Sequence, residues 1–154
     1  MRTGVRIGVD VGKVRIGIAR SDPHGMLATP VETIQRGAGD VKRIAEIAAE
    51  FDALELVVGL PLSMAGTDSA STGDARAFAD ALARELNYPV RLVDERLSTV
   101  SAHSAMRASG RSQKQSRSVI DQVAAVIILQ NALDVERAGR EPGVVVNPDE
   151  GTES

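Results

Sequence analysis

The N-terminal part of the chain has two short stretches rich in β-branched residues, with only a few residues between them. The stretches are residues 5–10 and 14–20, and Val11, Gly12 and Lys13 separate them. This pattern predicts a strand, a tight turn and a second strand. In a Rossmann fold the first strand passes directly into a helix. The opening therefore argues against a dinucleotide-binding fold and predicts a sheet that starts with an antiparallel hairpin.

The rest of the chain alternates apolar strands with amphipathic helices. Further strands are predicted over residues 27–34, 54–59 and 90–94, and helices over residues 40–51, 75–86 and 98–110 and from Ser118 onward. We expect residues 111–118 to form a polar loop and residues 139–154 a disordered tail. The order predicts one α/β domain over residues 1–138, with a mixed central sheet of about five strands flanked by helices.

The amino-acid composition excludes several kinds of functional site. The 154 residues include no cysteine and two histidines, which excludes a disulfide framework, a thiolate zinc site and a cysteine nucleophile and argues against a serine–histidine triad. Two phenylalanines and one tyrosine supply almost no surface on which nucleic-acid bases could stack. A net charge of -3 argues against a generally basic coat. The chemistry that remains is that of Asp and Glu.

The chain lacks the features of an exported or membrane-spanning protein. Its first residues, MRTGVRIGVDVG, contain no apolar signal-peptide segment. No apolar run reaches the roughly 18 residues that a membrane helix needs. The sequence therefore predicts a cytoplasmic protein without a membrane partner.

Three carboxylates fall at the ends of predicted elements. Asp10 ends the first strand, Glu95 follows the strand over residues 90–94, and Asp121 lies in the first turn of the predicted last helix. Ligands of open α/β sheets bind at the carboxyl ends of parallel strands, where these side chains can converge. Crowded carboxylates require raised pKa values or a bound cation. Oxygen ligands alone favour a hard ion, Mg²⁺ or Mn²⁺, which can activate water at a phosphodiester.

Each of these acids also has a purely local interpretation. Asp10 is suited to the turn that follows it. Glu95 could form an exposed ion pair with its neighbour Arg96. Asp121 stands three residues after Ser118, as in a capping box. The joint placement of the three acids supports a shared site better than any one of them does.

A basic stretch could hold the phosphates of a nucleic acid. Residues 107–117 contain four basic residues and no acidic one, in a chain whose total charge is negative. The alternative is an ordinary solvated loop. The candidate nucleic-acid-binding residues are Arg111, Lys114 and Arg117 of this stretch, together with Arg15 and Arg96 near the strand ends.

Four segments of the chain resemble, in order and spacing, the YqgF family, which is also called RuvX. They are GVDVGKVRIGIARSD, VVGLPLSMAGT, VRLVDERLST and IDQVAAVIILQ, and the resemblance runs from about Gly4 to Leu133. It implies a ribonuclease H-like fold related to the Holliday junction resolvase RuvC, and the predicted order of elements fits that fold. It also implies a nuclease for the 5′ end of precursor 16S ribosomal RNA. The family's acidic positions match Asp10, Glu95 and Asp121.

These observations favour a Mg²⁺- or Mn²⁺-dependent endonuclease that processes structured RNA during ribosome biogenesis. Asp10, Glu95 and Asp121 would be both its catalytic residues and its metal ligands. The protein would be a monomer or a homodimer. One alternative is a Holliday junction-resolving DNA nuclease, which needs two active sites about a two-fold axis. Others are a non-catalytic RNA-binding factor, whose acids only cap and turn, and a fragment of an ATP-dependent kinase or chaperone, which the short chain opposes.

Overall fold

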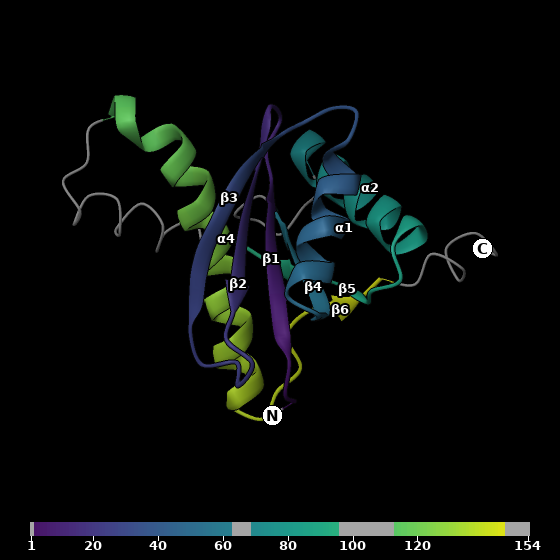
Figure 1. Cartoon of the computed structure of the whole chain (residues 1–154), viewed down its shortest axis with the longest axis vertical. Coiled ribbons are helices and arrows are strands. Elements are labelled where there is room, and N and C mark those ends of the chain that lie inside the picture. The colour runs from purple at the N-terminus through teal and green to yellow at the C-terminus, as the bar shows by residue number, and fades with distance from the viewer. Residues whose placement is uncertain (1, 63–68, 96–112, 147–154) are drawn as a thin grey trace.

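The computed structural model describes residues 2–62, 69–95 and 113–146, and the side chains of residues 113–119 are outside this description. The predicted helix over residues 98–110 lies outside the described residues. The elements, shown in Figure 1, are β1 (Val5–Val11), β2 (Arg15–Ser21), β3 (Ala28–Gln35), α1 (Asp40–Glu50), β4 (Ala53–Leu60), α2 (Ala70–Glu85), β5 (Val90–Asp94), α4 (Gln113–Arg137) and β6 (Val144–Val145).

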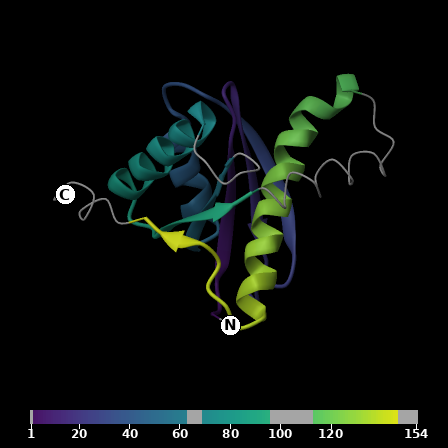
Figure 2. The same cartoon turned by 180° about the vertical axis from the view of Figure 1, so that it is seen from behind.

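The strands form one mixed sheet in the order β3-β2-β1-β4-β5-β6. The predicted hairpin is confirmed, because β1 pairs antiparallel with β2, and β2 in turn with β3. Strands β1, β4 and β5 run parallel to one another. Helices α1 and α2 cover one face of the sheet and α4 crosses the other, as Figures 1 and 2 show from opposite sides. The carboxyl ends of β1, β4 and β5 therefore meet at one edge.

The strands at the centre of the sheet are buried on both faces, as the apolar run over residues 54–59 predicts. Leu56 of β4 belongs to the core cluster that contains Ile47 of α1 and Leu82 of α2. Its neighbour Val57 points the opposite way and packs with Leu129 of α4. Adjacent residues of a strand point to opposite faces, so β4 contributes to both layers of the core.

Helix α4 is longer than the sequence predicts. It begins at Gln113, so Ser118 lies inside it and the prediction that Ser118 caps this helix is wrong. The expected polar loop over residues 111–118 is helical from Gln113, although the stretch has no apolar residue with which to pack. None of the helices in the described part of the chain combines the length and the apolarity needed to cross a bilayer.

The sheet also has a strand that the sequence assigns to a disordered tail. Strand β6 pairs antiparallel with β5 through Leu92 with Val144 and Arg91 with Val145, and it makes the sixth strand where about five are predicted. Two β-branched residues suffice because β5 would otherwise present an open edge that can accept a partner. Residues 147–154 lie outside the described part of the chain, and the division into domain and tail stays a prediction.

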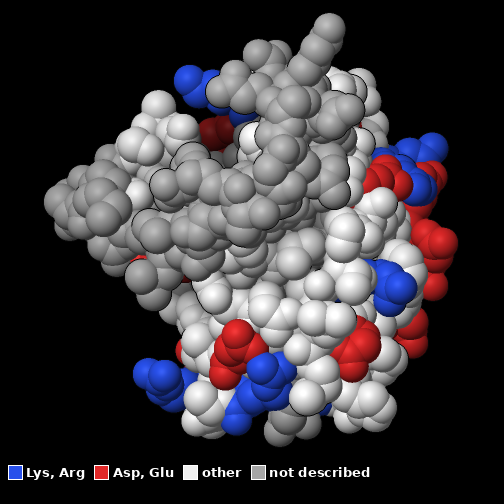
Figure 3. Space-filling model, turned by 90° about the vertical axis from the view of Figure 1, so that its left-hand side faces the viewer, with Lys and Arg blue, Asp and Glu red and all other residues white. Residues whose placement is uncertain are grey.

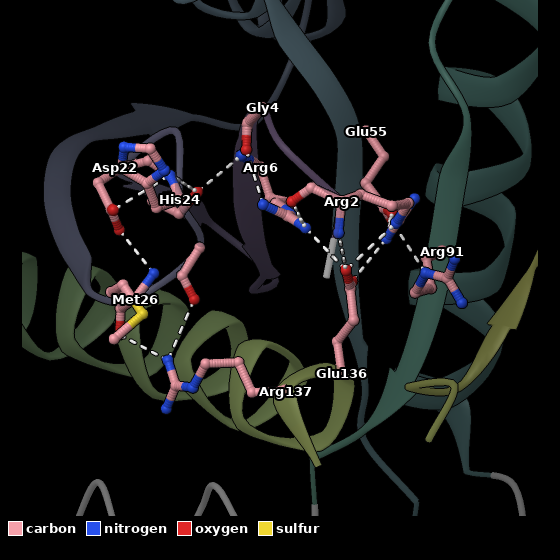
Figure 4. A network of polar contacts seen from close by, with 12 residues as sticks. Arg2, Gly4, Arg6, Asp22, His24, Met26, Glu55, Arg91, Glu136 and Arg137 are labelled. Atoms are coloured by element: carbon pink, nitrogen blue, oxygen red, sulfur yellow. Dashed lines mark hydrogen bonds and ion pairs between the residues drawn. The ribbon is translucent and has the colours of Figure 1, made fainter. Parts of the chain in front are cut away.

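A network of ion pairs joins the ends of several elements on the side of the sheet opposite the carboxyl ends of β1 and β5 (Figure 4). Glu136, near the end of α4, accepts hydrogen bonds from Arg6 Nη2 at 2.8 Å and from Arg2 Nη2 at 2.7 Å. Arg2 also pairs with Glu55 of β4, whose other oxygen accepts from Arg91 Nε at 2.7 Å. Arg6 and Glu55 are almost fully buried, so each depends on its oppositely charged partners in the network to compensate its charge.

Glu136 should make the fold sensitive to acid. The hydrogen bond from Arg2 is the main cause that lowers the pKa of Glu136 from 4.5 to about 2. A carboxyl whose pKa is depressed on folding stabilises the protein above its unfolded pKa and loses this contribution as the pH falls toward the folded value. Glu136→Gln should therefore lower the free energy of unfolding at pH 7 by about 3 kcal/mol, and the difference should shrink between about pH 4.5 and pH 2.

Urea denaturation as a function of pH measures this effect. Glu46→Gln is the matched control, because Glu46 pairs with Arg43 on the surface of α1 with about half of its side chain exposed. The control should cost no more than about 1 kcal/mol. Equal losses in the two variants would contradict a stabilising role for the buried network.

Candidate active site

The candidate site begins with the alternation of side chains along β1. Val9 faces the core under α1 and α2. Gly8 faces α4, where a Cβ atom would collide with the side chain of Leu129. Asp10 comes two residues after Gly8 and so lies on the same side as α4. The strand thus places its carboxylate on the helix-covered face, at the carboxyl end of β1.

Close packing of α4 on β2 brings Asp121 to the same place. Asp10 pairs with Gly17 across the hairpin. A Cβ on Gly17 would overlap the carbonyl oxygen of Asp121, so only a glycine lets the helix backbone approach this closely. Because Asp10 and Gly17 are neighbours in the sheet, Asp121 lies next to Asp10.

Glu95 reaches the site across β4. Its backbone N–H donates to the carbonyl of Leu60 at 3.2 Å, which continues the β4–β5 pairing one residue beyond β5. A Cβ on Gly59 would collide with Glu95 Oε2, so the carboxylate passes over this glycine. Gly59 follows Val58, the partner of Val9, and is therefore beside Asp10 in the sheet. The three acids come from β1, the end of β5 and α4.

The pKa values show that these carboxyls are crowded. Burial and the charge of Asp121 raise the pKa of Asp10 from 3.8 to about 6. Burial, followed by the charges of Asp10 and Asp94, raises the pKa of Glu95 from 4.5 to about 7. Such shifts are the sign of negative charges held together away from water. They are common at functional sites and are unusual for carboxylates that only cap or turn.

The structure argues against the local interpretations of Asp10 and Asp121. Asp10 lies inside β1, and the turn after it is closed by a backbone hydrogen bond from Gly12 to Arg15. Asp121 is more than two turns beyond the start of α4, too far along to cap it. The ion pair of Glu95 with Arg96 stays a prediction, because Arg96 lies outside the described residues.

Arg15 lies directly against the acids. Its Nε donates to Asp121 Oδ2 at 2.9 Å, and the two side chains are 30% and 19% exposed. Nothing in the sequence singles out this pair, because more than one hundred positions separate the two residues. The importance of Gly17 and Gly59 was equally invisible, since their role depends on which elements cross them.

The donor set fits a hard divalent cation in its chemistry. Three carboxylates supply oxygen ligands only, and a cation would offset both the burial and the repulsion that raise the pKa values of Asp10 and Glu95. Within the described residues, however, no three acidic or histidine side chains converge closely enough to hold an ion without rearrangement. Oδ2 of Asp121 is engaged by Arg15, so this oxygen becomes available to a metal only when the ion pair opens.

The predicted nucleic-acid-binding residues are only partly placed. Arg15 lies at the site. Lys114 and Arg117 belong to the first part of α4 rather than to a loop, and Arg96 and Arg111 lie outside the described residues. On the face drawn in Figure 3, basic and acidic side chains alternate over the described surface and no field of a single sign is seen there. The role of these residues in binding therefore stays a prediction.

Comparison with known proteins identifies the family. The sequence model of the RuvX family, described as Holliday junction resolvase, matches residues 4–135. The chain belongs to the RuvX family. Proteins named "Putative pre-16S rRNA nuclease" are 63% identical over 150 residues in Clavibacter sepedonicus, covering 95% of this chain and 93% of that protein. In Leifsonia xyli subsp. xyli the identity is 61% over 151 residues, covering 96% and 97%.

Solved structures confirm the predicted fold of this RuvX chain. The structure of T. thermophilus RuvC in complex with a Holliday junction substrate is similar, with a TM-score of 0.61 and 16% sequence identity, covering 92% of this chain and 99% of that one. The Thermus thermophilus RuvC structure has a TM-score of 0.57 at 15% identity, covering 91% and 99%. The RuvX chain therefore has the ribonuclease H-like fold.

The crowding of the acids predicts a gain in stability when one of them is neutralised. A carboxyl whose pKa is raised on folding destabilises the protein as the pH rises from its unfolded to its folded pKa. Without metal, wild-type stability should fall between about pH 4.5 and pH 7 through Glu95. Glu95→Gln should then be more stable than the wild type at pH 8 by about 1 to 3 kcal/mol, and the gain should vanish near pH 4.5. Thermal unfolding in chelator measures both; a variant less stable at pH 8 would contradict the crowding.

Proposed function

We propose that this protein is a divalent-metal-dependent nuclease that cleaves structured RNA at the 5′ end of precursor 16S ribosomal RNA. The observation that carries the proposal is that Asp10 lies within electrostatic reach of both Asp121 and Glu95 on one face of the sheet, with raised pKa values at Asp10 and Glu95. The names of the relatives support the substrate class. The activity would take place in the cytoplasm, where the sequence predicts the protein to be.

The proposed mechanism gives each acid a role in holding Mg²⁺ or Mn²⁺. When bound, such an ion supplies a water of lowered pKa and a positive charge for the phosphate. Asp10 and Glu95 would supply oxygen ligands from the rigid ends of β1 and β5, which fix their carboxylates in place. Asp121 would supply a third from α4. Because the pKa of Glu95 is about 7, this carboxyl can also exchange a proton near neutral pH when no cation is present.

The basic residues would hold the substrate beside these acids. Arg15 at the hairpin, Arg96 after β5, and Arg111, Lys114 and Arg117 around the start of α4 are the residues that we assign to phosphate contacts. Contacts of this kind do not read sequence, so the recognised feature would be the shape of the RNA backbone.

A junction-resolving DNA nuclease is the second candidate. The description of the matching family and the fold shared with RuvC favour it. Paired incision requires two active sites about a two-fold axis, so this candidate needs a dimer on the DNA. Sedimentation with junction DNA separates the two, because a monomer on that DNA would exclude paired cleavage. An RNA-binding factor without activity would bind RNA equally well with and without divalent metal.

Asp10→Asn tests the proposed function directly. The variant should lose at least about a hundredfold in the rate of cleavage of precursor 16S RNA, because a carboxylate at the metal would be replaced by a neutral amide. Its binding to the same RNA should remain within a few-fold of the wild type. Gel assays with Mg²⁺ and filter binding in chelator measure the two properties.

Thermal unfolding with added Mn²⁺ is the accompanying measurement. A metal at one hundred times its dissociation constant stabilises a protein by about 2.7 kcal/mol, so the melting temperature of the wild type should rise. That of Asp10→Asn should rise much less. Cleavage at the wild-type rate by Asp10→Asn would refute the mechanism.

A further inference from the structure

Arg15 has a fixed position beside the acid cluster. The turn that precedes it is closed by the hydrogen bond from Gly12 N–H to the carbonyl of Arg15 at 2.9 Å. A Cβ on Gly12 would come within 2.6 Å of this same carbonyl oxygen, so the turn depends on glycine. Arg15 is also the first residue of β2, two positions before the Gly17 that contacts α4. The sheet and turn therefore hold the base of the Arg15 side chain directly opposite α4.

The contact between Arg15 and Asp121 uses one edge of each group. Nε of Arg15 donates to Oδ2 of Asp121 at 2.9 Å. Within the described part of the chain, neither terminal nitrogen of this guanidinium donates a hydrogen bond to another residue. Among the described residues, the guanidinium therefore makes its hydrogen bond to Asp121, and its positive charge compensates the negative charge of this carboxylate.

A divalent cation and Arg15 would compete for this carboxylate. Both are positive, and each is attracted to the same group of acids. Like charges repel strongly at short range, so a cation at the cluster would be repelled by a guanidinium that stayed in contact with Asp121. The ion pair must open before Asp121 Oδ2 can become a metal ligand.

We propose that Arg15 is a place-holder cation: in the free protein its guanidinium stays paired with Asp121 until a divalent ion displaces it. This competition limits how tightly the acids bind metal. This inference rests on the proposed function, because it takes the acid cluster to be a metal site. It differs from a contact to the substrate in that it acts on the free protein. It also differs from a role in positioning Asp121, since removal of a positioning residue would weaken metal binding.

Calorimetric titration of the full-length protein with Mn²⁺, without nucleic acid, tests the proposal. Arg15→Gln should bind Mn²⁺ about tenfold more tightly than the wild type, because it removes both the competitor and the repulsion. Arg15→Lys keeps the charge and should stay within about threefold of the wild type. Lys13→Gln is the matched control: it removes a charge from the same turn at an exposed residue that makes no ion pair within the described residues, and it should change the affinity less than twofold.

The outcomes separate this inference from the proposed function. Tighter binding by Arg15→Gln alone supports the place-holder role, including the case in which the wild type binds Mn²⁺ too weakly to measure. Unchanged or weaker binding by Arg15→Gln, with measurable binding by the wild type, overturns it and leaves the metal site standing. Absence of Mn²⁺ binding in all four proteins overturns both. Thermal unfolding in chelator verifies that each variant is folded before it is titrated.

Discussion

The architecture of this protein depends on how closely α4 can approach the sheet. Three neighbouring strands present a glycine to this helix or to the acid beside it, and in each case a Cβ atom would collide with what lies above. These glycines are Gly8 in β1, Gly17 in β2 and Gly59 in β4. At these three positions the surface of the sheet that faces α4 carries no side chain. An alanine-sized side chain at Gly8 or Gly17 would meet the backbone of α4 and push the helix away from the sheet, which would separate Asp121 from Asp10.

This close approach has an electrostatic cost at one end of the helix and a compensating gain at the other. At Asp121 it places a second carboxylate near the buried Asp10, and burial together with this charge raises the pKa of Asp10. At the far end of α4, Glu136 pairs with Arg2 and Arg6, and its pKa falls to about 2. The same helix thus crosses from a region where buried carboxyls have raised pKa values to one where a carboxylate is paired with two arginines. Such an arrangement lets a protein keep a destabilised site within a stable fold.

The sequence predicts the central strands and the helices α1 and α2 better than it predicts the start of α4 and the edge strand β6. The hairpin, the buried strand β4 and the helices α1 and α2 follow from local periodicity, which requires only neighbouring residues. The start of α4 could not be predicted in this way, because residues 113–117 are uniformly polar and nothing local distinguishes a helix from a loop there. Strand β6 was missed for a related reason, since two valines form a strand only when an open sheet edge is within reach.

The site illustrates the same division between local and long-range information. Asp10 and Glu95 could be chosen because they end strands, and the ends of parallel strands meet by geometry. The sequence points to Asp121 through a helix start that the structure places at Gln113, eight residues before Asp121, so the position of Asp121 beside Asp10 follows from the packing of α4 on Gly17. The contact with Arg15 is more distant still from any local pattern. The sheet and α4 set where the acids of this chain lie, while the contact from Arg15 compensates part of their charge. Under the proposed function, the affinity of these acids for a metal therefore depends on a side chain outside the acid set.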